Sequence, residues 1–223
     1  MTVTVDEFDV ADLADAWTRA GFTVGSDAVC RIGGIGIRLV GRDRGAGILG
    51  WSLRGLPSDG SVHDLDGVPT TRSNEAPAAS TTHRNGVIAI DHVVLLSPDL
   101  GRTVESLAAV GVDPRRERDS ELDGRPIRQI FFRLGEVIVE VVGAPDMAGE
   151  GPSSLWGMTY AVTDIDATAS FFGDGTAPVT DAVQPGRRIT TLRHRAFGMS
   201  VRTALISAPV GRNGLRDKEL GYR

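Results

Sequence analysis

Three segments of the chain show the same order of hydrophobic and polar positions. Each begins with a short apolar run, passes an aspartate-containing cap, continues with apolar residues at helical spacing and stops at a glycine. The glycines are Gly21, Gly111 and Gly173. In the middle segment, Ser97 suits the N-cap and Pro98 suits the first helical position. The pattern predicts three units, each with a strand followed by a helix.

A hairpin sequence follows two of these predicted helices in nearly the same form. Residues 30–41 read CRIGGIGIRLVG and residues 132–143 read FRLGEVIVEVVG, with arginine, glycine and branched apolar residues at matching places. A third helix and hairpin, more divergent, run from Trp156 to residue 207. We interpret the chain as an internal duplication with a degenerate third copy.

These units predict an α+β fold of repeated β-α-β-β-β modules that form curved, partly open mixed sheets around a cleft. One unit is too small to bury its apolar sheet face alone, so units are expected to pair edge to edge. The predicted divisions are an N-terminal module-like αββ segment (1–56), a linker with local turns only (57–86), a domain (87–210) of two modules (87–145 and 154–209), and a polar tail (211–223). Three copies cannot all pair in twos, and the unpaired edge predicts a homodimer.

Composition and charge exclude several function classes. The 223 residues carry a formal net charge of −5 with a pI of about 5.4, which offers no basic surface to nucleic acid or to anionic membranes. No apolar run approaches the roughly 18 residues of a membrane span, and the N-terminus lacks a signal-peptide pattern. Cys30 is the single cysteine, which excludes an internal disulfide and a thiolate zinc cluster. We expect a cytoplasmic protein without nucleic-acid or membrane partners.

Two segments carry a resemblance to a known family. The run IDHVVLLSPDL at residues 90–100 and the hairpin FFRLGEVIVEVVG at residues 131–143 resemble the vicinal oxygen chelate superfamily. This superfamily includes glyoxalase I, bleomycin-resistance proteins, fosfomycin-resistance enzymes and extradiol dioxygenases. The resemblance covers residues 87–208 well and residues 9–41 more loosely. It implies paired modules, a cleft on the curved sheet, and often a divalent metal held by histidine and glutamate from the first and last strands.

The resemblance transfers two metal-ligand positions to this chain. It places His92 at the ligand position of a first strand and Glu140 at that of a last strand. In the third copy the matching residues are Gly157 and Ala204, and in the first copy Arg38 stands where Glu140 does. None of these replacements binds a metal. A stable divalent site needs at least three protein ligands, so we favour no cofactor; a divalent metal, if present, is held by His92 and Glu140.

Several side chains are candidates for the cleft. Glu140 interrupts a run of valine and isoleucine, which favours a cleft position because a carboxylate in an apolar strand is costly unless exposed or paired. Strand alternation places Ile138 on the same face, and the resemblance adds His92. The alternative for His92, which follows Asp91, is a hydrogen-bonded histidine at a sheet edge. Arg133 and Trp156 are further candidates; the alternatives are an exposed strand charge for Arg133 and core packing for Trp156.

Three more residues depend on how the chain folds. His83 and His194 lie near predicted turns and complete a site only if the fold brings them to the cleft. If the first and second copies pair, Arg38 faces Glu140 across the cleft. If the second and third copies pair, it does not.

Three functions are compatible with these residues. We favour a glyoxalase- or bleomycin-resistance-like protein that binds an unidentified small molecule in the cleft without a metal. The first alternative is a divalent-metal-dependent lyase, isomerase or dioxygenase, in which the metal is the Lewis acid and Glu140 is ligand or catalytic base. The second alternative is a catalytically inactive scaffold or dimerisation protein. The number of metal ligands separates the first two, and whether the protein is an enzyme stays open.

Overall fold

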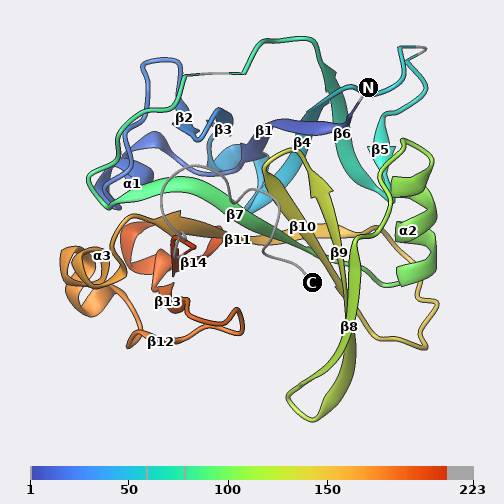
Figure 1. Ribbon diagram of the computed structural model, residues 1–223. Coiled ribbons are helices and arrows are strands. Elements are labelled where there is room, and N and C mark those ends of the chain that lie inside the picture. Colours follow the sequence, from blue (N-terminus) through green and yellow to red (C-terminus); the bar gives the residue numbers. More distant parts are fainter. Residues whose placement is uncertain (1, 59, 78, 210–223) are drawn as a thin grey trace.

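The computed structural model describes residues 2–58, 60–77 and 79–209 and shows two curved, partly open mixed sheets with few helices (Figure 1). The N-terminal sheet has the strand order β2-β3-β1-β4-β6-β5, and the C-terminal sheet has the order β12-β13-β14-β11-β7-β10-β9-β8. The strands of the N-terminal sheet are β1 (Thr4–Val10), β2 (Val29–Ile32), β3 (Ile35–Leu39), β4 (Ile48–Arg54), β5 (Asp64–Leu65) and β6 (Val68–Ser73). The strands of the C-terminal sheet are β7 (Val87–Leu96), β8 (Arg116–Leu122), β9 (Arg125–Leu134), β10 (Val137–Gly143), β11 (Ser154–Val162), β12 (Thr180–Asp181), β13 (Arg188–Leu192) and β14 (Arg202–Ser207). The predicted α+β class is confirmed.

The C-terminal sheet consists of two modules with the same topology. In the first, β7 leads through α2 (Leu100–Ala108), β8 and β9 to β10, which returns parallel to β7. In the second, β11 leads through α3 (Ile165–Phe172), β12 and β13 to β14, which returns parallel to β11. β7 and β11 pair antiparallel, and α2 and α3 lie at opposite ends of the sheet (Figure 1). The second and third sequence copies therefore pair with each other.

The N-terminal sheet repeats this pairing with fewer strands and one helix, α1 (Ala14–Arg19). β1 lies parallel to β3 and antiparallel to β4, and β4 lies parallel to β6. β1 and β4 thus take the places that β7 and β11 hold in the other sheet. The described residues of the two sheets form four units, and the second of these, built from β4 to β6, has no helix among its described residues.

β5 and β6 lie inside the predicted linker, where the prediction of turns alone is wrong. The polar composition of the segment hides a strand, because Val68 and Thr70 are buried while Pro69 between them is exposed. Thr70 Oγ1 accepts a hydrogen bond of 2.8 Å from the buried Trp51 indole, which satisfies both groups. β6 pairs with β4, so the N-terminal unit has a partner unit within the same chain. The premise of an unpaired unit, from which a homodimer is predicted, is therefore wrong. The homodimer remains a prediction without that argument, and the tail at 211–223 lies outside the described residues.

The two repeated hairpins have the same register. Ile32 pairs with Ile35 and Leu134 pairs with Val137, so each loop contains two residues. Gly33 and Gly135 begin these loops with φ of 59° and 71°, a conformation that favours glycine. The sequence match between the two copies therefore reflects the same local structure.

The helix α2 begins two residues later than predicted. Asp99, not Ser97, is its N-cap, since Asp99 Oδ1 accepts a hydrogen bond of 3.0 Å from the amide of Arg102. Ser97 Oγ accepts from the amide of Asp99 at 3.1 Å and supports the turn before the cap. The prediction of Ser97 as N-cap is wrong because Asp99, two residues later, accepts from an amide of the first helical turn, whereas Ser97 accepts from the amide of Asp99 itself.

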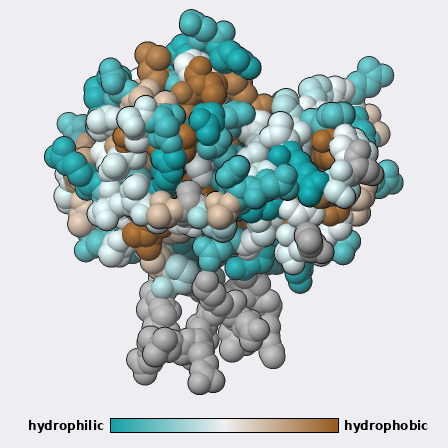
Figure 2. Space-filling model, turned by 90° about the horizontal axis from the view of Figure 1, so that it is seen from above, coloured by the Kyte–Doolittle hydropathy of each residue, from teal (hydrophilic) through white to brown (hydrophobic). Residues whose placement is uncertain are grey.

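The two sheets pack their apolar faces together, and the fully buried side chains include Phe8, Trp17, Trp51, Phe132 and Tyr160. The face of the molecule seen in Figure 2 is mostly hydrophilic or neutral, with hydrophobic areas between. Among the described residues, no helix has the length and apolar character of a membrane span.

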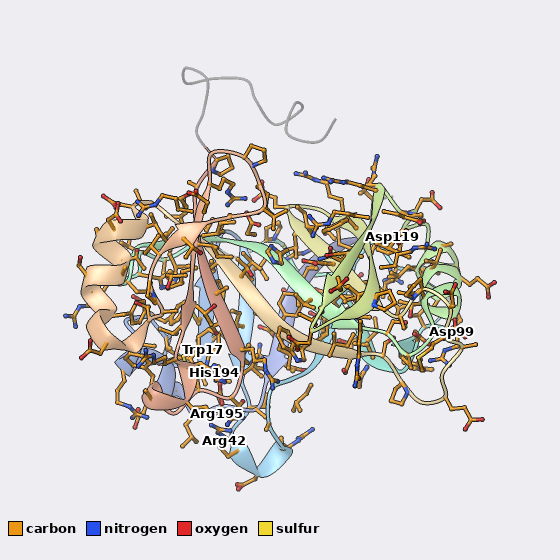
Figure 3. All side chains as sticks on the ribbon, turned by 90° about the horizontal axis from the view of Figure 1, so that it is seen from below. Trp17, Arg42, Asp99, Asp119, His194 and Arg195 are labelled. Carbon is orange, nitrogen blue, oxygen red and sulfur yellow. The ribbon has the colours of Figure 1, made fainter. Side chains whose placement is uncertain are left out.

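A buried carboxylate joins the two halves of the molecule. Asp12, fully buried, accepts hydrogen bonds from the Trp17 indole at 3.1 Å, the Ser200 amide at 2.9 Å and the Ser200 hydroxyl at 2.7 Å. Arg42 Nε lies 3.3 Å from the same carboxylate. Trp17, Arg42 and His194 lie on one side of the molecule (Figure 3). This cluster fixes α1 against the turn that precedes β14.

Candidate functional site

Strand register places the predicted site residues in two rows on one face of the C-terminal sheet. This face, opposite the N-terminal sheet, is called the open face below. Residues paired on neighbouring strands point to the same side. The first row is Glu140, Val94, Gly157 and Arg202, and the second is Ile138, His92, Thr159, Ala204 and Thr191. Their neighbours along the strands, such as Val93, Val139 and Met158, are buried in the core.

A β-bulge brings Asp91 to the side of His92. In β11, Thr159 and Tyr160 are consecutive, but their partners in β7 are His92 and Ile90, so Asp91 is the extra residue. His92 Nδ1 lies 2.9 Å from Asp91 Oδ2, and in this hydrogen bond the imidazole N–H donates to the carboxylate. The bond fixes the orientation of the ring and directs Nε2 along the open face.

Arg187 stabilises Asp91 from the other side. Its Nη2 lies 2.7 Å from Asp91 Oδ1, and its Nε donates to the Ser207 carbonyl at 2.7 Å. Both side chains of this ion pair are about nine-tenths buried. Burial raises the pKa of Asp91, but the hydrogen bond from His92 and the Arg187 cation lower it by more, so the pKa lies below its ordinary value. Asp91 is therefore charged at neutral pH.

Glu140 lies next to His92 on the open face. Its Oε2 is 3.6 Å from His92 Nε2, which is too long for a hydrogen bond, and its other oxygen accepts from the Gln129 amide. Arg118 in turn donates to Gln129 Oε1 at 2.9 Å. The site therefore contains a connected polar chain, of which sequence reasoning identifies His92 and Glu140 as site residues.

A pocket of about 300 Å³ adjoins these groups on the open face. It lies over Gly157 and Ala204, which hold in the second module the positions that His92 and Glu140 hold in the first. Its lining includes Val94, Trp156, Gly157, Thr159, Arg202 and Ala204. His194, from the 3-10 turn His194–Phe197, also lines it. The pocket therefore lies where the second module has no metal-binding side chain.

The donor set does not fit a divalent metal. Gly157 and Ala204 carry no donor atom at the two remaining ligand positions, and Arg202 stands beside Gly157 in the register. An ideal Cβ at Gly157 would lie 2.8 Å from the Arg202 carbonyl oxygen, so β14 leaves no room for a histidine there. Among the described residues, no three His, Cys, Asp or Glu side chains form a group that could hold a metal ion.

The N-terminal sheet has an ion pair at the matching positions. Glu7 pairs with Gly36 as His92 pairs with Ile138, and Arg38 stands in β3 where Glu140 stands in β10. Arg38 Nε lies 2.6 Å from Glu7 Oε1. The guanidinium thus binds the carboxylate of its own sheet. The alternative in which Arg38 faces Glu140 is wrong, since the first and second copies do not pair.

The other predicted candidates separate into two groups. Ile138 lies beside His92 in the register, and Trp156 lines the pocket with 44% of its surface exposed, so core packing does not apply to Trp156. Arg133 is exposed, donates to the Gly135 carbonyl at 3.0 Å and does not line the pocket. Its exposed-charge alternative describes it better. His194 reaches the pocket, and His83 does not.

His83 has a structural role between the segment before β7 and the N-terminal unit. It is buried, its Nδ1 accepts a hydrogen bond of 3.0 Å from the Thr23 amide, and its Nε2 lies 3.2 Å from the Arg31 carbonyl oxygen. Both contacts are satisfied by a neutral ring protonated at Nε2. Burial is the main reason that the pKa of His83 lies below its ordinary value.

This environment predicts a pH dependence of stability. Because the pKa of His83 is lower in the folded state, the unfolded chain binds the proton more readily, and the free energy of unfolding should fall as pH drops below about 6.5. The His83→Gln variant, whose neutral amide can both accept and donate a hydrogen bond, should show a flatter dependence in urea titrations between neutral and mildly acidic pH. An equal slope in the two proteins would contradict this role. The pKa of His194 is also lowered, so some slope should remain.

Comparisons with known proteins identify the fold. No family model matches the sequence, and no curated protein matches it. Among solved structures, a variant of 4-hydroxymandelate synthase from Streptomyces coelicolor matches with a TM-score of 0.64 and 14% identity, over 97% of this chain and 94% of that one. A catechol 2,3-dioxygenase matches with a TM-score of 0.62 and 11% identity, over 97% of each chain. An extradiol ring-cleaving dioxygenase from B. fuscum matches with a TM-score of 0.59 and 15% identity, over 93% of this chain and 72% of that one.

These neighbours belong to one superfamily, and identities this low establish shared architecture rather than shared chemistry. The paired modules in the two sheets of this chain agree with that shared architecture. The chain has the fold of the vicinal oxygen chelate superfamily.

Proposed function

We propose that the protein binds a small organic molecule on the open face of its C-terminal sheet, over Gly157 and Ala204, without a resident divalent metal. The observation that carries the proposal is the coincidence of the pocket with these two positions. Where the first module has an imidazole and a carboxylate, the second module has no side-chain donor. A concave site with apolar walls and a few polar groups is the usual form of a small-molecule site.

A second pocket on the surface is a less suitable ligand site than the pocket on the open face. It is lined by Asp66, Arg102 and Ser106 among others. Asp66 there accepts hydrogen bonds from Arg102, Thr103 and Ser153, so its carboxylate is occupied by the protein's own donors. On the open face, by contrast, no described residue forms a hydrogen bond or an ion pair with the Arg202 guanidinium.

The alternative function is a metal-dependent lyase, isomerase or dioxygenase with Glu140 as ligand or base. The extradiol ring-cleaving dioxygenase among the structural neighbours is the reason for considering this alternative. In this chain, His92 and Glu140 are two donors where three are needed. Elemental analysis of purified protein should find no stoichiometric zinc, manganese, nickel or iron. About one metal per chain that disappears in His92→Ala would overturn the proposal and favour the enzyme.

The Ala204→Leu variant tests the pocket. The larger side chain should fill space over the sheet without contacting the core, because Ala204 faces the open side between Thr159 and Thr191. We expect ligands found by protein-observed NMR in a screen of small organic compounds to lose binding by about a hundredfold in this variant, with its thermal stability retained. The matched control is Ala177→Leu, at a residue outside the pocket lining. Equal binding to both variants and the parent would contradict the proposed site.

A further inference from the structure

We infer that the ligand of this pocket is a small organic acid, whose carboxylate is bound by Arg202 and whose opposite end faces His92 and Glu140. The inference rests on the proposed function and adds the charge and orientation of the ligand. It follows from the difference in charge between the two ends of the open face.

Arg202 is a pocket-lining cation available to a ligand. Its guanidinium carbon lies 4.8 Å from the centre of the Trp156 ring, a cation–π contact that holds the side chain at the pocket, and its N–H groups form no hydrogen bond with any described residue. No carboxylate among the described residues forms an ion pair with it, whereas Arg38, Arg187 and Arg188 each have one. A planar guanidinium matches a carboxylate with two parallel hydrogen bonds.

The neighbours of Arg202 also favour an anion. His194 lines the same pocket, and Arg195 follows it in the chain (Figure 3). Burial is the first cause of the lowered pKa of His194, and the nearby Arg195 and Arg202 cations lower it further. Added negative charge is therefore favourable at this end of the pocket. The pocket volume of about 300 Å³ is at the lower end of the range for ligand pockets, so the acid must be a compact molecule.

The other end of the open face is acidic. Glu140, Val94, Gly157 and Arg202 form one row, so Glu140 and Arg202 are three strand spacings apart, or about 14 Å between backbones. Asp91 and Glu140 flank His92, which would repel a carboxylate placed there. A ligand acid is thus directed to Arg202, and a hydrogen-bond donor on its far end is matched by the Glu140 carboxylate.

The apolar middle of the pocket accommodates the body of such a molecule. Val94 lies between the charged ends, and Gly157 contributes no side chain beside it. The Trp156 ring forms one wall, with Arg202 against it. The site therefore combines a cationic end, an apolar floor and an acidic end in a single row.

Matched acids and amides test the inference. The probes are hexanoate, benzoate, 3-phenylpropionate and 3-(4-hydroxyphenyl)propionate, each with its neutral amide, titrated into the full chain by protein-observed NMR. At least one acid should bind about tenfold or more tightly than its amide, and Arg202→Gln should remove that difference. Arg188→Gln, an exposed arginine outside the pocket lining, is the matched control and should leave it unchanged.

The outcomes separate this inference from the proposed function. If amides and acids bind equally, and Ala204→Leu abolishes both, the inference is overturned while the pocket stands. If acids bind preferentially but equally well to Arg202→Gln, the assignment of the carboxylate to Arg202 is overturned. If no acid or amide binds up to about 10 mM, the acid ligand is rejected, and the wider screen with Ala204→Leu decides the pocket alone.

Discussion

Replacing Asp12 with alanine should lower the free energy of unfolding by about 3–5 kcal/mol. The carboxylate is fully buried and accepts from the Trp17 indole and from both the amide and the hydroxyl of Ser200, 188 positions away in the chain. Without it, several donors lose their acceptor in a place that water does not reach, and Arg42 loses its carboxylate partner. Chemical denaturation monitored by tryptophan fluorescence measures the loss.

Two variants make this prediction specific. Asp12→Asn keeps the size of the side chain but places an amide nitrogen among donors, so we expect an intermediate loss. Asp15→Ala changes an exposed acidic residue of the same segment and should change stability by no more than about 0.5 kcal/mol. A loss for Asp12→Ala as small as that of Asp15→Ala would show that the cluster does not join the two halves energetically.

Introducing a carboxylate at position 204 should create a divalent-metal site. Ala204 holds, in the second module, the place that Glu140 holds in the first, so Ala204→Glu adds a third donor to His92 and Glu140. Residues that only hydrogen-bond to metal ligands change metal affinity by about 10–100-fold. A residue that binds the metal directly should therefore tighten Zn²⁺ or Mn²⁺ binding by about a hundredfold or more. Isothermal titration of the variant and the parent gives the two affinities.

The control for this gain is a carboxylate elsewhere on the same face. Thr191 pairs with Ala204 on the next strand, further from His92, and Thr191→Glu should gain little affinity. Adding His92→Ala to Ala204→Glu should remove the gain. Equal affinities for the Thr191 and Ala204 variants would contradict the correspondence between Ala204 and Glu140.

The sequence predicts the architecture of the C-terminal sheet well because its signals are local. Helical spacing up to Gly111 and Gly173, and the repeated hairpin around Gly135, follow from short-range backbone preferences. β6 is missed because two of its buried positions, Thr70 and Ser73, are polar. The Thr70 hydroxyl finds its partner, the Trp51 indole, only in the folded chain. Polar composition then resembles a linker.

The candidate site shows the same difference between residues with a local sequence signal and residues whose roles depend on the fold. His92 and Glu140 are predicted from the family resemblance, and Glu140 also from its place within an apolar strand. The structure brings the two side chains together on the open face. Arg187 and Gln129 are missed because their roles depend on which strands become neighbours. Arg187 follows a turn at Gly186, where nothing in the local pattern indicates burial beside Asp91.

The position of a bound ligand tests the central claim most directly. A crystal structure of the protein with an acid selected by titration should show the molecule over Gly157 and Ala204, with its carboxylate against Arg202 and no metal ion between His92 and Glu140. A metal ion coordinated by His92 and Glu140 with the ligand bound to it, or a ligand seated away from the open face, would contradict the account.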